Sequence, residues 1–442
     1  MIKIFTASVV LMLLFAGCAQ KRFLVLDLDD SQIRDLKELP QEVSAYIQNL
    51  QEHPSLLPSQ MEYERKYYRI WNNTPIDANL TEVMWPHRVF TASKAFYGIN
   101  LKRLSSDFYE RMLERADFAD FMHTARRALT IRGTNIRAFP TSEVLLRHPN
   151  SAGEGFPFDY LQNSYIAANK PLFVSHFSSD RKWAFVFSSF TSGWVKSEDI
   201  VFLPKRDADV WMQARQVHIL QDKMAVADED GYLFALRIGM MLPLVEENED
   251  SYTVLAATRR GIDTPVYKKI TISKEMASLK PLGFTGANVV KILSQLQKSR
   301  YGWGGMYGER DCSSTMRDYF APFGIWLGRN SAVQAKAGRV ISLEGLDDDA
   351  KRALIKKVGI PFETMLYRRG HIVLYLGTYH DKIIVFQNLW GIKMKKGGES
   401  GRVVVGRAVY STLDLGEHMP YYDADSSLIK KLKSINIPTQ PH

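Results

Sequence analysis

The sequence predicts a multidomain α+β protein with a helical N-terminal segment, two small β-barrels and a C-terminal α+β domain. Three patterns indicate this order: apolar residues at helical spacing, then short apolar runs between Asn, Ser and Gly turns, then mixed helical and strand-like runs. With 442 residues, 45% of them hydrophobic, the chain can bury several separate cores. We predict domains at 18–129, 130–207, 208–275 and 276–442.

Residues 1–20, MIKIFTASVVLMLLFAGCAQ, read as an export signal. Its apolar run at residues 4–15 is too short to span a bilayer as a stable helix. The triplet Ala16-Gly17-Cys18 resembles the lipobox of bacterial lipoproteins, which implies a signal peptide at 1–17 and a lipid on Cys18. Because Ala19 is not Asp, we expect an anchor in the outer membrane, facing the periplasm. The alternative is an ordinary signal peptide that contains a cysteine.

The net charge of +9 suits an acidic partner, such as nucleic acid, anionic lipid or anionic cell wall. The basic residues are scattered along the chain, and zinc-finger, helix-turn-helix and Gly-rich phosphate-loop patterns are absent, so we do not expect nucleic-acid binding. The sequence also lacks a metal-ligand cluster, and we expect neither a metal nor another cofactor. No segment after the export signal is apolar enough to cross a membrane.

The N-terminal segment, residues 21–129, reads as mostly helical. Ser59–Glu62 forms a capping box ahead of an aromatic-rich stretch that ends at Trp71. A further helix is predicted between Asp107 and Leu129 from the helical spacing of Phe108, Met112, Leu113, Ala116 and Phe121. These apolar side chains are predicted to be core.

Strand-like runs follow at Leu172–Val174, Trp183–Phe187 and Gly193–Val195. The last two runs carry tryptophans and meet at a tight glycine turn, which resembles the end of a bacterial SH3-like barrel. A second β-rich block, residues 208–273, looks like another barrel of this type. Trp183 and Trp194 are predicted to be half-buried core in preference to a ligand platform.

In the C-terminal domain, Thr285 is predicted to cap a helix whose apolar face is Val289, Ile292, Leu293 and Leu296. A second helix begins near Cys312, and two strands are predicted at His371–Gly377 and Ile383–Asn388. If Cys18 carries lipid, Cys312 is the only thiol of the mature protein, and an intramolecular disulfide is impossible.

Cys312 is a candidate nucleophile because of its place at the start of a helix. Unpaired N–H groups and the helix dipole favour the thiolate there, and the same N–H groups can hold an oxyanion. A thiolate that attacks an amide also needs a base and an acid, usually histidine. His371 stands at the start of a strand, and Gln387 on the next strand is positioned to orient its ring. Taken alone, a histidine in an apolar strand is more often structural.

The motifs Tyr301–Gly305, Asp311–Ser313 and Gly370–His371 resemble those of NlpC-type cell-wall peptidases, a papain-like family. The resemblance implies that Cys312 is the nucleophile and His371 the base. The third catalytic residue would be Gln387, although most relatives have histidine at this position and Asn388 is adjacent.

One subgroup of this family combines a helical N-terminal domain, two SH3-like barrels and the peptidase. Its members cleave the γ-D-glutamyl–diaminopimelate bond of muropeptides with a free N-terminal L-alanine, so the implied partner is a peptidoglycan peptide. The resemblance assigns substrate binding to Tyr301, Asp311, Ser313 and Ser331. Asp311 would supply the negative charge for the substrate ammonium. An acidic partner from the first barrel is not identified, and Asp159 and Glu198 are candidates by region only.

Two other functions stay open from the sequence. The protein could be a non-catalytic lipoprotein that binds the cell wall, since Gln387 replaces the usual histidine. It could also be an acyl transferase on the same fold, which would pass the acyl group to an amine instead of water.

Overall fold

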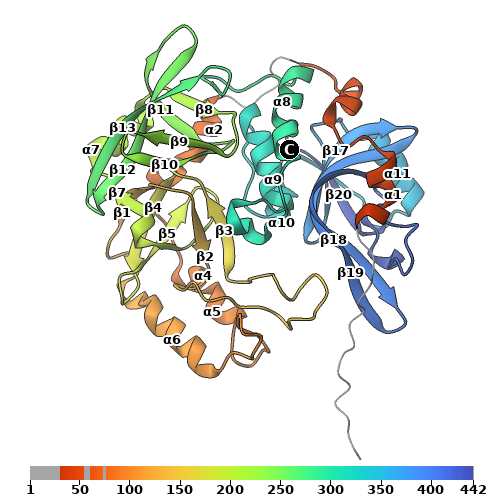
Figure 1. The fold of residues 1–442 in the computed structure, drawn as a ribbon, viewed down its shortest axis with the longest axis horizontal. Coiled ribbons are helices and arrows are strands. Elements are labelled where there is room, and N and C mark those ends of the chain that lie inside the picture. Colours follow the sequence, from red (N-terminus) through yellow and green to blue (C-terminus); the bar gives the residue numbers. More distant parts are fainter. Residues whose placement is uncertain (1–29, 54–59, 73–75, 442) are drawn as a thin grey trace, which may run out of the picture.

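The computed structural model describes residues 30–53, 60–72 and 76–441. The predicted signal peptide, the lipidation site Cys18 and the predicted cap Ser59 lie outside these residues. Figure 1 shows the two β-barrels and most of the N-terminal helices on one side, the C-terminal sheet on the other, and helices of the C-terminal domain between them. None of the helices in the described ranges is long and apolar enough to cross a membrane.

The N-terminal helices are shorter than predicted and serve two different parts of the fold. They are α1 (Arg34–Glu38), α2 (Gln60–Tyr67), α3 (Arg69–Asn72), α4 (Leu80–Val83), α5 (Trp85–Val89) and α6 (Ser106–Ala116). The segment with α1 lies against the C-terminal sheet (Figure 1), where Asn49 Nδ2 donates to Leu376 O at 2.9 Å. Tyr67 and Trp71 of α2 and α3 instead enter the core of the barrels.

The helix predicted between Asp107 and Leu129 is wrong in its second half. α6 ends at Ala116, because Asp117 adopts a left-handed backbone conformation with φ of 45°. Phe121 therefore lies outside this helix, and β1 (Arg126–Thr130) already belongs to the first barrel. That barrel begins ahead of the predicted boundary at residue 130.

The first barrel confirms the three predicted strands. Its sheet has the order β3-β2-β6-β5-β4-β1-β7, with β2 (Thr134–Arg137), β3 (Gln162–Ile166), β4 (Pro171–Phe177), β5 (Trp183–Ser188), β6 (Ser192–Lys196) and β7 (Ile200–Phe202). Trp194 is 0% exposed and Trp183 is 7% exposed, so both are core as predicted.

The second barrel follows α7 (Lys205–Gln213). Its five-stranded sheet has the order β13-β12-β11-β8-β14, and β9 pairs with β10 in a separate hairpin. The strands are β8 (Gln216–Ile219), β9 (Met224–Asp228), β10 (Gly231–Leu236), β11 (Met241–Glu247), β12 (Ser251–Gly261), β13 (Thr264–Ser273) and β14 (Ala277–Ser278). One cluster of buried residues joins α2 and α3 to both barrels.

The C-terminal domain is an antiparallel sheet covered by helices. The sheet order is β15-β20-β16-β17-β18-β19. Its elements are α8 (Gly286–Leu296), α9 (Cys312–Phe320), α10 (Ser331–Gln334), β15 (Arg339–Ser342), α11 (Asp348–Val358), β16 (Met365–Arg368), β17 (His371–Tyr379), β18 (Lys382–Lys396), β19 (Glu399–Thr412), α12 (Leu428–Lys431) and β20 (Leu432–Ile437). The predicted cap on α8 is present, since Thr285 accepts from the backbone N–H of Asn288.

A buried arginine fixes the start of α9 to the second barrel. Arg310 is 1% exposed and donates to Asp222 at 2.7 and 2.6 Å and to Asp318 at 2.8 Å. Burial by itself would raise the pKa of Asp222, but Arg310 outweighs it and lowers that pKa to about 2. This ion-pair cluster holds the residue before Asp311 and Cys312 in place.

Candidate active site

Cys312 is the first residue of α9, and a capping box holds this helix end. Asp311 Oδ1 accepts from the backbone N–H of Ser314 at 2.8 Å, and the backbone N–H of Asp311 donates to Ser314 Oγ at 2.8 Å. The thiol is buried, with Cys312 only 7% exposed. The sequence motif D-C-S therefore places the cysteine on a rigid helix start.

The glycine-rich run before Cys312 brings the first barrel against the site. Gly304 and Gly305 have φ of 59° and 82°. A Cβ on Gly304 would lie 2.4 Å from the carbonyl oxygen of Gln162 in β3, which only glycine avoids. Gln162 Nε2 donates to Gly304 O at 3.1 Å.

His371 opens β17 and is oriented by a chain of hydrogen bonds from β18 and β19. Ser411 Oγ donates to Thr412 O at 3.0 Å, so it accepts from Gln387 Nε2, at 2.7 Å. The oxygen Oε1 of Gln387 therefore faces the imidazole, 2.8 Å from Nε2 of His371. This arrangement places the proton on Nε2 and leaves Nδ1 as the basic nitrogen. Sequence reasoning missed Ser411, because its link to His371 exists only through the sheet register.

Asn388, the alternative to Gln387, has a different role. Its Nδ2 donates to Arg310 O at 3.0 Å and to Thr315 Oγ1 at 3.3 Å. Successive residues of a strand point to opposite faces, so Asn388 fixes the start of α9 while Gln387 contacts His371.

Burial acts on the pKa values of the thiol and the imidazole in opposite directions, and in each case it favours the neutral form. Burial raises the pKa of Cys312 to about 12, with Asp311 adding to the rise and the N–H of Ile372 opposing it. Burial lowers the pKa of His371 to about 4, which Gln387 only partly offsets. Burial therefore opposes the thiolate that the helix start favours. The contact with Ile372 places the sulfur beside the start of β17.

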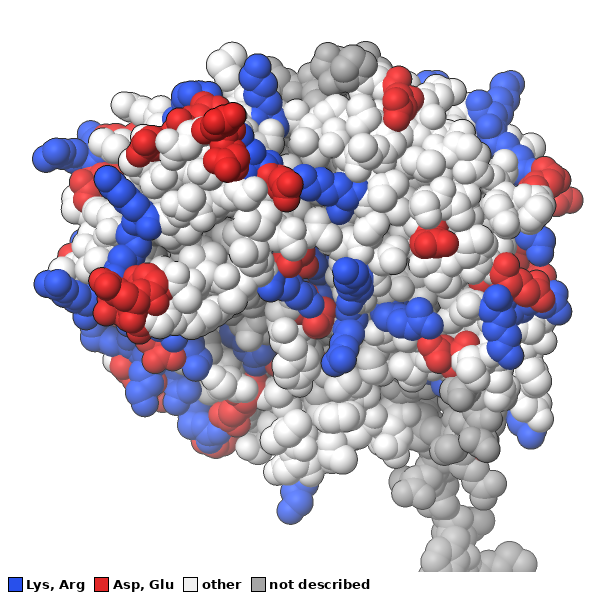
Figure 2. Space-filling view, turned by 45° about the horizontal axis from the view of Figure 1, so that its top comes forward, with Lys and Arg blue, Asp and Glu red and all other residues white. Residues whose placement is uncertain are grey.

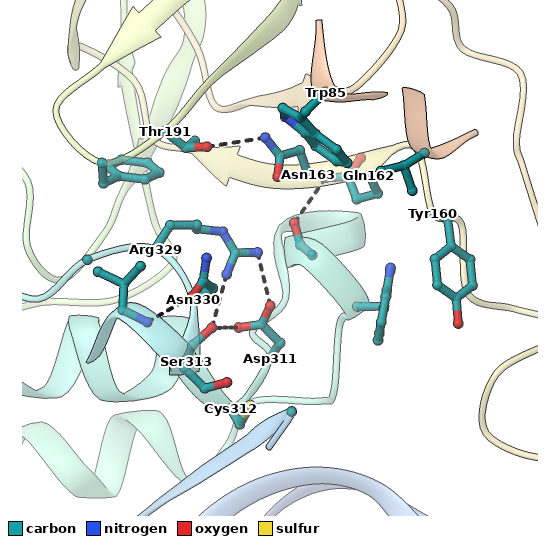
Figure 3. A pocket seen from close by; sticks show the side chains of 18 of the residues that line it. Trp85, Tyr160, Gln162, Asn163, Thr191, Asp311, Cys312, Ser313, Arg329 and Asn330 are labelled. Atoms are coloured by element: carbon teal, nitrogen blue, oxygen red, sulfur yellow. Dashed lines mark hydrogen bonds and ion pairs between the residues drawn. The ribbon is translucent and has the colours of Figure 1, made fainter. Parts of the chain in front are cut away.

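Asp311 is paired with an arginine that sequence reasoning did not connect to it. Arg329 Nη2 lies 3.0 Å from Asp311 Oδ2, and its Nη1 donates to Ser313 Oγ at 3.0 Å (Figure 3). Burial would raise the pKa of Asp311, but Arg329 and the hydrogen bonds from Ser314 keep it below its usual value. The negative charge of Asp311 is thus compensated within the protein.

A cavity of about 1310 Å³ opens above Cys312. All four predicted binding residues, Tyr301, Asp311, Ser313 and Ser331, line it. The opposite wall comes from the first barrel and the N-terminal segment, as Figure 3 shows for Trp85, Tyr160, Gln162, Asn163 and Thr191. Burial raises the pKa of Tyr301 well above its usual value, with Cys312 and Asp311 adding to the rise.

The charges around this cavity are mostly positive. Asp311 is the only carboxylate among the described residues that line it. Five basic residues line it as well: Arg69, Lys94, Arg147, Arg329 and Lys336. Asp159 and Glu198, the candidates for a second acidic partner of the substrate, do not line this cavity. Asp159 pairs with Arg137, and Glu198 pairs with Lys196 at 3.4 Å. Elsewhere on the surface, the face in Figure 2 shows basic and acidic side chains interspersed. Within residues 30–53, 60–72 and 76–441, no group of three or more His, Cys, Asp or Glu residues is placed to hold a metal.

Comparison with solved structures finds the same fold. The chain is similar to an NlpC/P60 endopeptidase from Photobacterium damselae subsp. piscicida, with a TM-score of 0.78, 23% identity, and coverage of 91% of this chain and 98% of that one. An NlpC/P60 family protein from Bacillus cereus ATCC 10987 matches with a TM-score of 0.45 and 14% identity, over 70% of this chain and 98% of that one. Comparison with the curated proteins found no match.

Four family models match the chain in sequence order. They describe an N-terminal NLPC_P60 stabilising domain at 7–121, an SH3 domain of SH3b1 type at 145–196, an SH3 domain of SH3b2 type at 205–249, and the NlpC/P60 family at 298–380. The last match includes Cys312 and His371. The chain therefore carries an NlpC/P60 domain behind an N-terminal stabilising domain and two SH3 domains, as its sequence motifs predict.

Proposed function

We propose that this protein is a cysteine hydrolase that cleaves the γ-D-glutamyl–diaminopimelate bond of peptidoglycan stem peptides. One observation carries the proposal: Cys312 starts α9 beside β17, whose first residue, His371, lies 2.8 Å from the orienting Gln387. An NlpC/P60 domain with a cysteine and a histidine in these places supports a cell-wall peptidase.

The hydrogen-bond directions support a defined order of proton transfers. Nδ1 of His371 takes the thiol proton while the sulfur of Cys312 attacks the γ-glutamyl carbonyl carbon and forms a C–S bond. Backbone N–H groups at the start of α9 stabilise the oxyanion. The imidazolium then protonates the leaving amine as the C–N bond breaks. His371 then deprotonates a water that attacks the thioester carbonyl, and the C–S bond breaks as the imidazolium returns the proton to the sulfur of Cys312.

The walls of the cavity support short stem peptides as substrates in preference to intact glycan strands. Gln162 and Thr191 of the first barrel and Trp85 of α5 face the side of the cavity that Cys312 lines. These residues limit the thickness of any molecule that reaches the thiol. The two SH3 domains support binding to peptidoglycan fragments.

For the amino end of the substrate we propose a free L-alanine, as the family resemblance implies. Its ammonium must compete with Arg329, because that guanidinium already lies 3.0 Å from Asp311. Nη1 and Nη2 of Arg329 already donate to Ser313 and Asp311, so the ammonium has to displace part of an ion pair that exists without the substrate.

We also propose that the mature protein begins at Cys18, carries a lipid there and faces the periplasm from the outer membrane. Mass spectrometry of the membrane-extracted protein tests this directly. A lipid-modified N-terminal cysteine is expected, and its absence from a fully soluble wild-type product would refute the anchor.

The decisive experiment is incubation of the purified mature protein with L-Ala-γ-D-Glu-diaminopimelate in a buffer without primary amines. Steady release of free diaminopimelate is expected, measured by mass spectrometry, and Cys312→Ser should release none. Release that requires an added amine would show an acyl transferase. Binding of the peptide without release by the wild type would show a non-catalytic wall-binding protein.

A further inference from the structure

A second cavity, of about 240 Å³, lies on the histidine side of the catalytic pair. His371 and Gln387 line this cavity, and Tyr301, Trp303 and Gly370 line both cavities. The two spaces therefore meet at the reacting groups. The smaller one lies below the range of roughly 300–1,000 Å³ that holds drug-sized ligands, so it suits about one amino-acid residue.

Two arginines that line this smaller cavity have no counter-ion among the described residues. Arg368, the last residue of β16, donates from Nη1 to Ser426 O at 3.2 Å, and its buried Nε has no hydrogen-bond partner. Arg402 of β19 reaches only carbonyl oxygens, those of Ala152 at 3.4 Å and Gly391 at 3.5 Å. In the part of the chain that the structure describes, neither guanidinium has an ion pair.

The two carboxylates that act electrostatically on Arg402 already form ion pairs with other basic residues. Asp423 lies 2.8 Å from Lys393, and Glu154 pairs with Arg147 at 2.5 Å. Burial lowers the pKa of Arg402, and the positive charge of Arg368 lowers it further. Two like charges in a small, partly buried space are stabilised when an anion binds between them.

The first barrel holds Arg402 in this position. Gly153 lines the cavity, and a Cβ on it would lie 2.3 Å from Arg402 Nε, so the loop lies directly against the guanidinium. Phe158 of the same barrel and Trp390 of β18, whose ring centroids are 5.1 Å apart, form an apolar wall. The cavity thus combines an aromatic wall with two fixed cationic groups.

The chemistry assigns this cavity to the leaving half of the substrate. The imidazole must deliver its proton to the leaving amine, so the residue that carries this amine lies on the His371 side. We infer that Arg368 and Arg402 bind a free carboxylate of that residue. This inference rests on the proposed function and deepens it: the enzyme selects peptides whose leaving residue, such as diaminopimelate, carries an unblocked carboxylate.

The first test is kinetic and compares three substrates. They are L-Ala-γ-D-Glu-diaminopimelate, the same peptide with the α-carboxylate of diaminopimelate amidated, and the peptide with lysine in place of diaminopimelate, which lacks the side-chain carboxylate. Wild type should prefer the first substrate over at least one other by roughly 10–100-fold in kcat/KM, the worth of a charge-assisted hydrogen bond. The disfavoured peptide identifies which carboxylate is bound. Equal rates on all three overturn the inference and leave the proposed function intact.

Variants then locate the selectivity. Arg368→Gln and Arg402→Gln should each remove most of the preference, and the Lys variants should restore part of it, because a positive charge remains. Arg369→Gln is the matched control, since Arg369 is the exposed neighbour of Arg368 and lines neither cavity. Its preference should equal that of wild type. Thermal unfolding verifies that each variant is folded, and folded Gln variants that keep the full preference overturn the inference.

A binding measurement separates this inference from the proposed function. Cys312→Ser protein is titrated with free diaminopimelate and with its diamide by calorimetry, which requires no turnover. Tighter binding of the dicarboxylate, lost in the Cys312→Ser/Arg368→Gln double variant, supports the carboxylate site even if no peptide is hydrolysed. Equal binding of both compounds, or none, overturns it.

Discussion

The two sides of the catalytic pair both carry buried or half-buried arginines, but among the described residues only the cysteine side supplies a counter-ion. There, Arg329 lies 3.0 Å from Asp311 and also contacts Ser313. On the histidine side, Arg368 and Arg402 donate to backbone carbonyls and form no ion pair with any residue that the structure describes. Arg329 therefore contributes to the resting structure, whereas the positive charges of Arg368 and Arg402 are available to a ligand.

Removal of the thiol should have the largest effect on turnover, because Cys312 is the proposed nucleophile. The arginines on either side of it should be unaffected. Cys312→Ser should lower kcat by at least roughly three powers of ten, since a neutral hydroxyl is a much weaker nucleophile. Steady-state release of diaminopimelate measures this, with Cys312→Ala as a second variant. Unchanged substrate binding to both variants, by calorimetry, would show that the arginine sites remain. A variant with wild-type turnover contradicts the assignment of Cys312.

Removal of the ion pair between Arg329 and Asp311 on the cysteine side should lower the free energy of unfolding. Arg329→Gln leaves the carboxylate of Asp311 buried without its ion-pair partner, which costs about 3–5 kcal/mol of unfolding free energy. Urea denaturation at pH 7 measures this loss. The double variant Asp311→Asn/Arg329→Gln should recover part of it, and Arg339→Gln, at an exposed arginine, serves as the control. If Arg368→Gln destabilises the fold as much as Arg329→Gln, the contrast between the two sides fails.

The same ion pair predicts a pH dependence of stability. The pKa of Asp311 is lowered in the folded state, so its contribution is fully present above the unfolded pKa of about 3.9 and is lost as the pH falls through the folded pKa. The stability difference between wild type and the double variant should therefore shrink as the pH is lowered from 5 towards 2. A difference that stays constant over this range argues against an ionised Asp311.

The orienting residues should have intermediate effects on turnover. Gln387→Ala removes the acceptor for Nε2–H of His371 and should lower kcat roughly 10–100-fold with little change in KM. Gln387→His should retain much of the activity, because an imidazole nitrogen can accept the same hydrogen bond. Ser411→Ala should cost less, since it only frees the amide of Gln387 to rotate, and Ser400→Ala on the same strand is the control. A change in KM without a change in kcat would assign Gln387 to substrate binding.

The smallest expected effect concerns the acid limit of activity. Burial lowers the pKa of His371 to about 4, and the neutral ring is the required base, so kcat/KM should fall only when the pH drops towards that value. The pH–rate profile measures this limb. At pH 7 iodoacetamide should alkylate Cys312 more slowly than a model thiol, because burial keeps the thiol protonated. A limb near pH 6.5 with rapid alkylation would indicate a resting thiolate–imidazolium pair instead.

Local sequence signals were sufficient for the elements that carry the reacting groups. The predicted helix start near Cys312 is confirmed, and the capping box between Asp311 and Ser314 that holds it is a local interaction. The period of two in β18 places Gln387 and Asn388 on opposite faces, but only the pairing of β17 with β18 shows that Gln387 is the one that contacts His371. The family motifs, which are also local, identify the NlpC/P60 domain.

The tertiary structure decided the charges and the protonation states. Arg329 meets Asp311 across 18 residues of sequence, and Arg310 meets Asp222 across 88. Neither pairing has a local signal, since ion pairs across a fold depend on packing. Burial is also a property of the whole fold, and it is the largest cause of the raised pKa of Cys312. For the same reason, the uncompensated pair of Arg368 and Arg402 becomes visible only when β16 and β19 are placed in one sheet beside the first barrel.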